Sequence, residues 1–185
     1  MSATLVRHRF RVVDYEEMVE RGILTEDDRV ELLRGEVVEK TTIGPAHAAS
    51  VSRLNRLFQR RLGELAIVSI HSPVQLTDSQ PEPDVALLKP RDDFYASATP
   101  RADDVLLIVE VADSSLETDQ TLKREIYAET GIPEYWIVNL VDSCVEVYRE
   151  PIASGQYGVM KRLVRGEALA PLRFPECEVA VSDFL

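Results

Sequence analysis

The chain has few of the features that mark secreted or membrane-bound proteins. Of its 185 residues, 2 are cysteines, Cys144 and Cys177, too few for a disulfide framework or a cysteine-based zinc site. No apolar run approaches the roughly 20 residues that a membrane-spanning helix needs. Arginines interrupt the first residues, MSATLVRHRFRVV, before a signal sequence could form. We therefore expect a cytoplasmic protein with no membrane contact.

Positive charge is also scarce, because 21 Lys and Arg against 32 Asp and Glu give a formal net charge of −11. Phosphate contacts require Lys and Arg, so this net negative charge argues against a protein that binds nucleic acid over its whole surface. Arg53, Arg56 and Arg60 are a local exception, since they recur at helical spacing and could form a basic stripe for nucleic acid. Ordinary solvated helix positions explain the same spacing, so both interpretations stay open.

The length predicts one domain over residues 1–185. Its core is expected at about 45–150, after an N-terminal helix and hairpin at 14–40 and before a C-terminal β segment at 151–185. Two continuous apolar runs, LLIVEV and YWIV, are typical of strands covered on both faces, which predicts a mixed α/β fold. The expected core elements are a helix at 44–65, strands at 66–77, 83–88 and 105–111, a helix at 116–131, and strands at 134–140 and 143–150.

Two carboxylates stand out in these strands. Both faces of the 105–111 strand are apolar, so Glu110 is expected in or near the core. A buried carboxylate must be neutralised, paired or bound to a metal, and an ion pair with an arginine is the structural alternative. Asp84 begins the preceding strand beside Pro83, a common turn pair. Together, however, the two carboxylates could hold Mg²⁺, which binds a few carboxylate oxygens and keeps several waters.

A lysine follows on the next predicted helix. Helical geometry places Asp119, Lys123 and Tyr127 within one arc, on the face that should pack on the sheet. A lysine there extends to solvent, pairs with a carboxylate or acts in catalysis. Asp119, at i−4, is the simple ion-pair partner. Because the helix follows the Glu110 strand after a short loop, Lys123 is expected to return to that carboxylate.

The order of elements, with an Asp, a Glu and a nearby Lys, resembles the PD-(D/E)XK nuclease superfamily. The usual motif of that superfamily has Lys where this chain has Ala112, and a variant moves the lysine to the following helix. Over roughly residues 14–150, the chain is similar to the Uma-two family of restriction-endonuclease-like proteins. The similar segments are VELLRGEVVEK, PAHAASVSRLNRLF, PEPDVALL, LLIVEVADSS, DQTLKREIYAETGIPEYWIVNL and VEVYR.

The resemblance implies a restriction-endonuclease-like core of helix, three strands, helix and strand, with extra β-hairpins at both ends. It also implies an endonuclease that hydrolyses phosphodiester bonds of DNA. Asp84 and Glu110 would hold Mg²⁺, with Mn²⁺ as a substitute, and Lys123 would orient or deprotonate the attacking water. The alternative is a weak or inactive relative that binds nucleic acid or a protein partner. A homodimer is expected through the hairpins at both ends.

Two further residues, Glu36 and His47, occupy positions that recur in the family and could be accessory site residues. For His47, a residue satisfied locally at the start of a helix is an equally good interpretation. Glu31 and Glu39, which flank Glu36, are expected on a solvated hairpin.

Overall fold

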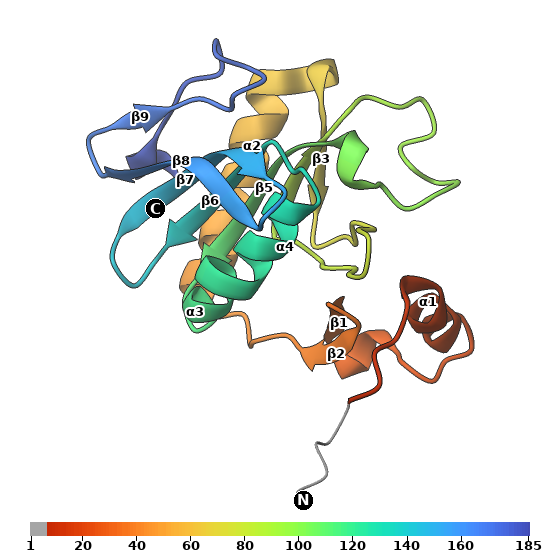
Figure 1. Cartoon of the computed structure of the whole chain (residues 1–185). Helices are drawn as coiled ribbons and strands as arrows, with labels where there is room; N and C mark the ends of the chain where they lie inside the picture. The colour runs from red at the N-terminus through yellow and green to blue at the C-terminus, as the bar shows by residue number, and fades with distance from the viewer. Residues whose placement is uncertain (1–6) are drawn as a thin grey trace, which may run out of the picture.

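A computed structural model describes residues 7–185 (Figure 1). Its centre is a six-stranded sheet in the order β3-β4-β5-β6-β7-β8. Neighbouring strands are antiparallel except for β5 and β6, which are parallel. The strands are β3 (Ile67–Ile70), β4 (Val85–Leu88), β5 (Val105–Ala112), β6 (Glu134–Asn139), β7 (Cys144–Ile152) and β8 (Gln156–Val164).

Helices cover both faces of the sheet, as the two apolar runs predict. The long helix α2 (Pro45–Leu62) lies on one face. A shorter helical segment, composed of α3 (Leu116–Thr118), the π-helical turn η4 (Asp119–Lys123) and α4 (Arg124–Glu129), lies on the other. This mixed α/β arrangement confirms the predicted fold class. Short 3₁₀ turns lie at η2 (Gly63–Leu65), η3 (Ala102–Asp104) and η5 (Val181–Asp183).

Alternation along β5 directs its side chains into two separate cores. Val109 packs with Phe58 of α2 and Trp136 in one core. Ile108 packs with Tyr127 of α4 in the other. Glu110 shares the second face, since side chains alternate along a strand. The only carboxylate of β5 therefore points towards the short helical segment.

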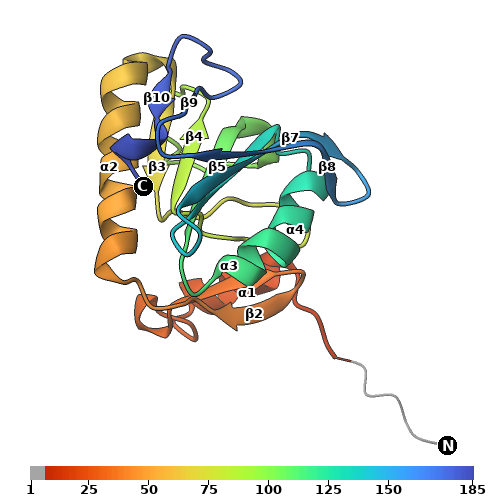
Figure 2. The ribbon, with the colours of Figure 1, turned by 90° about the vertical axis from the view of Figure 1, so that its left-hand side faces the viewer.

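The N-terminal part comprises α1 (Val12–Glu20), η1 (Glu26–Asp28) and a hairpin of β1 (Val30–Leu33) and β2 (Glu36–Glu39). The hairpin turns through Arg34 and Gly35, both with positive φ, as its sequence predicts. At Gly35 a Cβ would lie 2.8 Å from the Phe10 carbonyl oxygen, so glycine is required. In Figure 2 this N-terminal part lies across the lower end of the core, below α3.

Three predicted elements differ in extent from those observed. The strand expected at 66–77 ends at Ile70, because His71 adopts φ 47° and Ser72 precedes a proline. The helix expected at 116–131 contains a π-helical turn. The first strand of the tail, β8, is longer than the short strands expected there, and a small pair follows it, β9 (Ala168–Leu169) with β10 (Val179–Ala180). Across residues 7–185, no helix combines the length and hydrophobicity that crossing a bilayer demands.

Candidate active site

Asp84 and Glu110 meet on adjacent strands. Asp84 directly precedes β4, and the pairing of Val85 with Val109 places it beside Glu110 of β5. The Val111 amide donates to Asp84 Oδ2 at 2.7 Å, and the Asp84 amide donates to Glu110 Oε2 at 3.3 Å. Strand register therefore fixes the two carboxylates next to each other.

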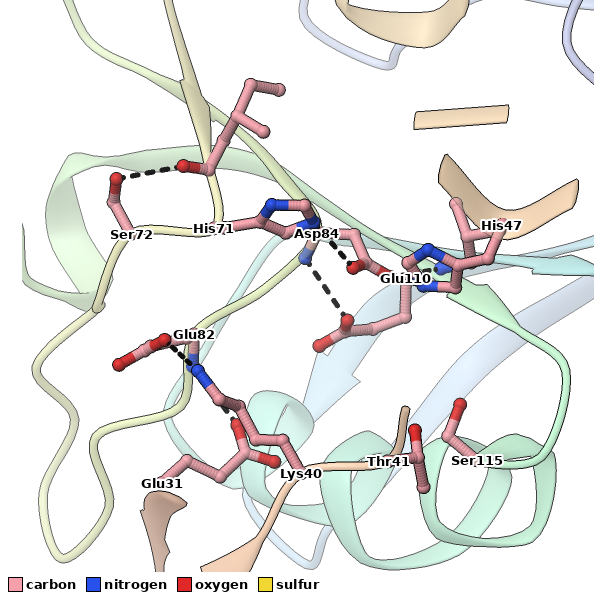
Figure 3. Close-up of polar contacts among 12 residues, drawn as sticks. Glu31, Lys40, Thr41, His47, His71, Ser72, Glu82, Asp84, Glu110 and Ser115 are labelled. Carbon is pink, nitrogen blue, oxygen red and sulfur yellow. Dashed lines mark hydrogen bonds and ion pairs between the residues drawn. The ribbon is translucent and has the colours of Figure 1, made fainter. Parts of the chain in front are cut away.

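Two histidines hold the carboxylate of Asp84 (Figure 3). His47 Nε2, near the start of α2, lies 3.0 Å from Oδ2, and His71 Nε2 lies 3.1 Å from Oδ1. The two imidazole rings are nearly parallel, with centroids 6.5 Å apart. His47 therefore contacts Asp84, a residue of a different element, rather than a partner within its own helix start. His71, which follows β3 in a left-handed conformation, joins it without a signal in the sequence.

Lys123 lies among three carboxylates. Its Nζ is 3.1 Å from Glu110 Oε1, 3.1 Å from Glu31 Oε1 and 4.0 Å from Asp119 Oδ1. The Tyr127 hydroxyl donates to the same Glu110 oxygen at 2.8 Å. With Lys123 and Tyr127 both on Oε1, the other oxygen of Glu110 faces Asp84.

The π-helical turn explains how one short segment contributes several buried polar groups. It spans Asp119–Lys123 between two α-helical turns, and both end residues are buried. A π turn widens the helix by one residue and is frequent at functional sites. Ser115 Oγ donates to Asp119 at 2.6 Å, which fixes this carboxylate at the start of the turn.

Burial and charge act in opposite directions on these groups. Burial raises the pKa of Glu110 to about 8, although the ammonium of Lys123 opposes this shift. Burial lowers the pKa of Lys123, but the carboxylates of Glu110, Glu31 and Asp119 outweigh it and hold that pKa above its usual value. Burial also raises the pKa of Asp119. Lys123 therefore stays an ammonium within a cluster that has more carboxyl groups than cations.

The pKa of Asp84 moves the other way. Burial would raise it, but hydrogen bonds with His47 and His71 outweigh burial and hold it below its usual value. Burial lowers the pKa of His47, yet its contact with Asp84 leaves that pKa raised. Asp84 is consequently the carboxylate of the pair that is ionised across the ordinary pH range.

These side chains line one cavity of about 780 Å³. Its floor is the end of the sheet with Asp84 and Glu110, and its wall includes Lys123. The opposite side is formed by α1, η1 and the β1–β2 hairpin, which contribute Glu31 and several apolar side chains. The acidic residues of the lining outnumber the basic ones: Glu26, Glu31, Glu39, Glu82, Asp84, Glu110 and Asp119 against Arg29, Lys40 and Lys123.

The donor set suits a hard divalent cation. Asp84 and Glu110 provide two adjacent carboxylates, which is the usual protein contribution to a Mg²⁺ site that keeps several waters. Among residues 7–185 no three His, Cys, Asp or Glu side chains form a metal-binding group, so a site made entirely of protein ligands does not fit. Both oxygens of Asp84 contact imidazole nitrogens, and His47 Nδ1 is buried without a hydrogen-bond partner. The residues thus fit a cation that is held by two carboxylates and keeps several waters.

The three glutamates of the β1–β2 hairpin have different positions. Glu36 is outside the cavity lining, and its carboxylate lies 3.7 Å from Arg7 and 4.0 Å from Arg9. The expectation that Glu31 is solvated is wrong, because it is 4% exposed and bound to Lys123. Glu39 is exposed, as expected.

The three arginines of α2 are also away from the cavity. Arg53, Arg56 and Arg60 are exposed, and none of them lines it. At 100° per residue they lie on the side of the helix opposite His47 and Leu54, which face the sheet. The structure therefore does not bring the stripe to Asp84 and Glu110.

Comparisons with known proteins bear on the fold and the family. The fold is that of a nuclease-like protein: a crystal structure titled "a putative nuclease belonging to DUF820 from Anabaena variabilis" superposes with a TM-score of 0.73 at 17% identity, covering 95% of this chain and 97% of that one. Residues 12–182 match the model of the Uma2 family, described as "Putative restriction endonuclease". The chain belongs to the Uma2 family, the family that its sequence segments resemble. No curated protein matches the chain.

Proposed function

We propose that this nuclease-like protein is a Mg²⁺-dependent endonuclease that hydrolyses phosphodiester bonds of DNA. The observation that carries the proposal is the arrangement around Glu110. One of its oxygens receives Lys123 and Tyr127, and the other lies beside the backbone of Asp84. Two adjacent carboxylates with a lysine inside one cavity are suited to phosphoryl transfer, and the family description supports the reaction class.

In the proposed reaction a water oxygen bonds to phosphorus and gives up a proton to solvent, while the bond to one ester oxygen breaks and that oxygen takes a proton from solvent. Asp84 and Glu110 would hold Mg²⁺, which when bound supplies Lewis-acid polarisation of the phosphate and stabilises the leaving oxygen. Mn²⁺ would substitute for it. Lys123, an ammonium among carboxylates, orients the water and neutralises charge that develops on the phosphate. The carboxylates around Lys123 raise its pKa, which favours orienting the water over deprotonating it.

The acidic lining of the cavity favours a second candidate. A phosphate entering the cavity meets more carboxyl groups than cations, and the arginine stripe lies on the other side of α2. A weak or inactive relative that binds nucleic acid or a protein partner would tolerate such a lining. Metal binding and cleavage measured together separate the two candidates, since a cation held by Asp84 and Glu110 would relieve the excess of negative charge that opposes the phosphate.

The test replaces Asp84 with Asn. A neutral amide is a poor ligand for Mg²⁺, so we expect Mn²⁺ binding, measured by isothermal titration calorimetry, to be lost together with cleavage of DNA. Asp103→Asn, an exposed position outside the cavity lining, is the matched control and should behave as wild type. Wild-type protein that binds Mn²⁺ but cleaves no nucleic acid would favour the second candidate. Equal Mn²⁺ binding by Asp84→Asn and wild type would exclude this metal site.

We also propose that residues 1–185 act as one domain and form a homodimer. The C-terminal residues pack on the core, because Ser50 of α2 donates to the Phe184 carbonyl at 2.6 Å. Strand β8 is an outer strand of the sheet and exposes Met160 and Val164. An edge strand of this length is able to pair with a second copy across a two-fold axis. Light scattering should give twice the chain mass, and Met160→Lys should lower it.

A further inference from the structure

The β1–β2 hairpin, Val30–Glu39, forms a roof over the candidate active site. Beneath it Glu110 is 3% exposed and Lys123 is 8% exposed, so neither group is presented on an open surface. The roof is itself well packed, with Leu32 at 0% and Leu33 at 2% exposure. A substrate therefore has to reach these groups inside the cavity.

Backbone contacts fasten the roof to the segment that precedes Asp84. The Gln80 amide donates to the Leu32 carbonyl at 2.7 Å, and the Gly35 amide donates to the Asp78 carbonyl at 2.8 Å. The Glu82 amide donates to Glu31 Oε2 at 3.1 Å. Each of these bonds ties the hairpin to the chain that leads into β4.

Ion pairs add to this attachment. Arg34, at the tip of the hairpin, pairs with Glu129 at 3.0 Å and with Glu125 at 3.3 Å on α4. Lys40, just after β2, pairs with Glu82 (Figure 3). The roof is thus held at its tip and at its base.

The roof also contributes to the site. Glu31 of β1 is one of the two carboxylates at 3.1 Å from Lys123. Lifting the hairpin would remove this partner and expose Leu32 and Leu33 to water, which is unfavourable. The arrangement in which Lys123 is held in place is therefore the one in which the roof is closed.

A closed roof restricts the shape of the substrate. A volume of about 780 Å³ lies within the range of pockets for small ligands, about 300–1,000 Å³. In a base-paired duplex each phosphate is held on a stiff double helix, so it cannot move into a recess of this size independently of its paired and stacked bases. A nucleotide out of the stack does fit a pocket of this kind, as in other enzymes that act on extruded bases.

The lining of the cavity matches an unpaired nucleotide. Leu24, Val38 and Leu122 supply apolar surface for a sugar and a base, while Lys123 supplies the cation for a phosphate. In a duplex the faces of the bases are stacked on each other and cannot use this surface. In a single strand they are free to do so.

We propose that the site acts on single-stranded DNA, or on unpaired segments of a duplex, and excludes intact duplex. This inference rests on the proposed function, because it names the form of the DNA that the nuclease accepts. Each base-pair step that must open to reach the cavity lowers the rate by about tenfold, since stacking contributes about 1.4 kcal/mol per step. A preference of tenfold or more for the single strand is expected.

The main experiment compares three substrates of one sequence in Mg²⁺ or Mn²⁺. They are a 5′-labelled single strand, its blunt duplex, and the same duplex with a central bubble of mismatched bases. We expect the single strand to be cleaved at least tenfold faster than the duplex, and the bubble substrate to be cleaved within the bubble. Equal rates on single strand and duplex would overturn the inference while leaving the proposed nuclease function in place.

A loosened roof gives a second test. Arg34→Gln with Lys40→Gln removes the ion pairs at the tip and base of the hairpin but keeps most of each side-chain stem. Surface ion pairs contribute up to about 1 kcal/mol each, so the preference for single strand should fall about threefold or more. Arg91→Gln with Lys161→Gln, outside the cavity lining, is the matched control and should keep the wild-type ratio. An unchanged ratio in the roof variant would show that the hairpin does not set the preference.

Binding in Ca²⁺, a cation that also takes carboxylate oxygen ligands, supplies a readout that does not depend on turnover. Fluorescence anisotropy of labelled single strand and duplex should then show at least tenfold tighter binding of the single strand by wild-type protein. If no DNA is cleaved, the nuclease function fails, and the anisotropy ratio still decides the inference. Equal affinity for both forms would overturn it.

Discussion

Glu110 and Glu134 are both buried glutamates in neighbouring strands of the same sheet, yet their surroundings differ. Glu134 of β6 is 0% exposed and accepts from Arg149 Nε at 2.7 Å, the Trp136 indole at 2.9 Å and the Leu172 amide at 2.6 Å. These donors come from β6, β7 and the tail, and none of the residues lines the cavity. Glu134 has its own guanidinium and is saturated with hydrogen bonds, so it stabilises the tail.

Glu110 has no cation of its own. It shares Lys123 with Glu31 and Asp119 and lies in the cavity floor. Burial raises the pKa of both glutamates. At Glu134 the Leu172 amide, the Trp136 indole and the Arg149 guanidinium oppose that rise. At Glu110 Lys123 opposes it, and the neighbouring carboxylates add to it. A buried acid with a dedicated arginine is a structural ion pair, and one that shares its cation beside a cavity is suited to bind a further cation.

The largest effect is expected at Lys123. Lys123→Met keeps much of the side-chain stem and removes the charge, so we expect cleavage to fall by about 10²-fold or more, the scale of single electrostatic groups. The carboxylates left behind can take up protons, so the fold should persist. Single-turnover cleavage and circular dichroism measure the two quantities. Equal cleavage by the variant and wild type would remove Lys123 from the mechanism.

Arg149→Met is the corresponding change at Glu134, because it removes the cation of that buried glutamate. It leaves Glu134 buried without its cation, so the free energy of unfolding should fall by about 3 kcal/mol, as for other broken buried pairs. Cleavage per folded molecule should not change, because Arg149 is outside the cavity. Urea denaturation gives the stability, and the activity is measured well below the transition. A loss of activity without a loss of stability would contradict the distinction between the two glutamates.

The sequence predicted the parts of the site that local pattern determines. Asp84 and Glu110 were found because each is an acid in an apolar strand, and Lys123 because it falls on the buried side of its helix. The sheet order around them follows from the alternation of strands and helices. Glu31 was misjudged because the hairpin reads as an ordinary surface element until its partner is known. One signal was present: Glu31 shares a strand face with Leu33, which is buried.

His71 and the roof could not be predicted in the same way. His71 reaches Asp84 because β3 ends early and the chain turns through a positive φ. The position of the hairpin depends on hydrogen bonds to residues 78–82. In each of these bonds the two partners are more than 40 residues apart in the chain. Contacts between such distant segments leave no periodic trace in the sequence.

A smaller effect is expected from pH in the absence of divalent cations. Below pH 4.5, the ordinary pKa of a glutamate, Glu110 is protonated in both the folded and the unfolded state. Between pH 4.5 and about 8, the unfolded chain has lost this proton and the folded chain keeps it. The contribution of Glu110 to stability is therefore full below pH 4.5 and is lost as pH rises towards 8. Glu110→Gln should remove this dependence.

Urea denaturation in EDTA at pH 5, 6, 7 and 8 measures this dependence. The difference in unfolding free energy between wild type and Glu110→Gln should move in favour of the variant as pH rises. Glu117→Gln, an exposed position on the same helical segment, is the control and should track wild type. If the difference in unfolding free energy does not change with pH, Lys123 and Tyr127 hold Glu110 ionised. Glu110 would then resemble Glu134.

The smallest effect is expected from the arginine stripe. If Arg53, Arg56 and Arg60 contacted three phosphates of a single strand, replacing all three with Gln would lower the slope of log affinity against log salt by about 2, at about 0.7 per phosphate. The three side chains lie on the side of α2 opposite His47, so we expect a change below about 1 and little loss of affinity. Anisotropy titrations at several salt concentrations measure the slope. A fall of about 2 with weaker binding would show that DNA continues from the cavity around α2, and would make the stripe a part of the substrate path.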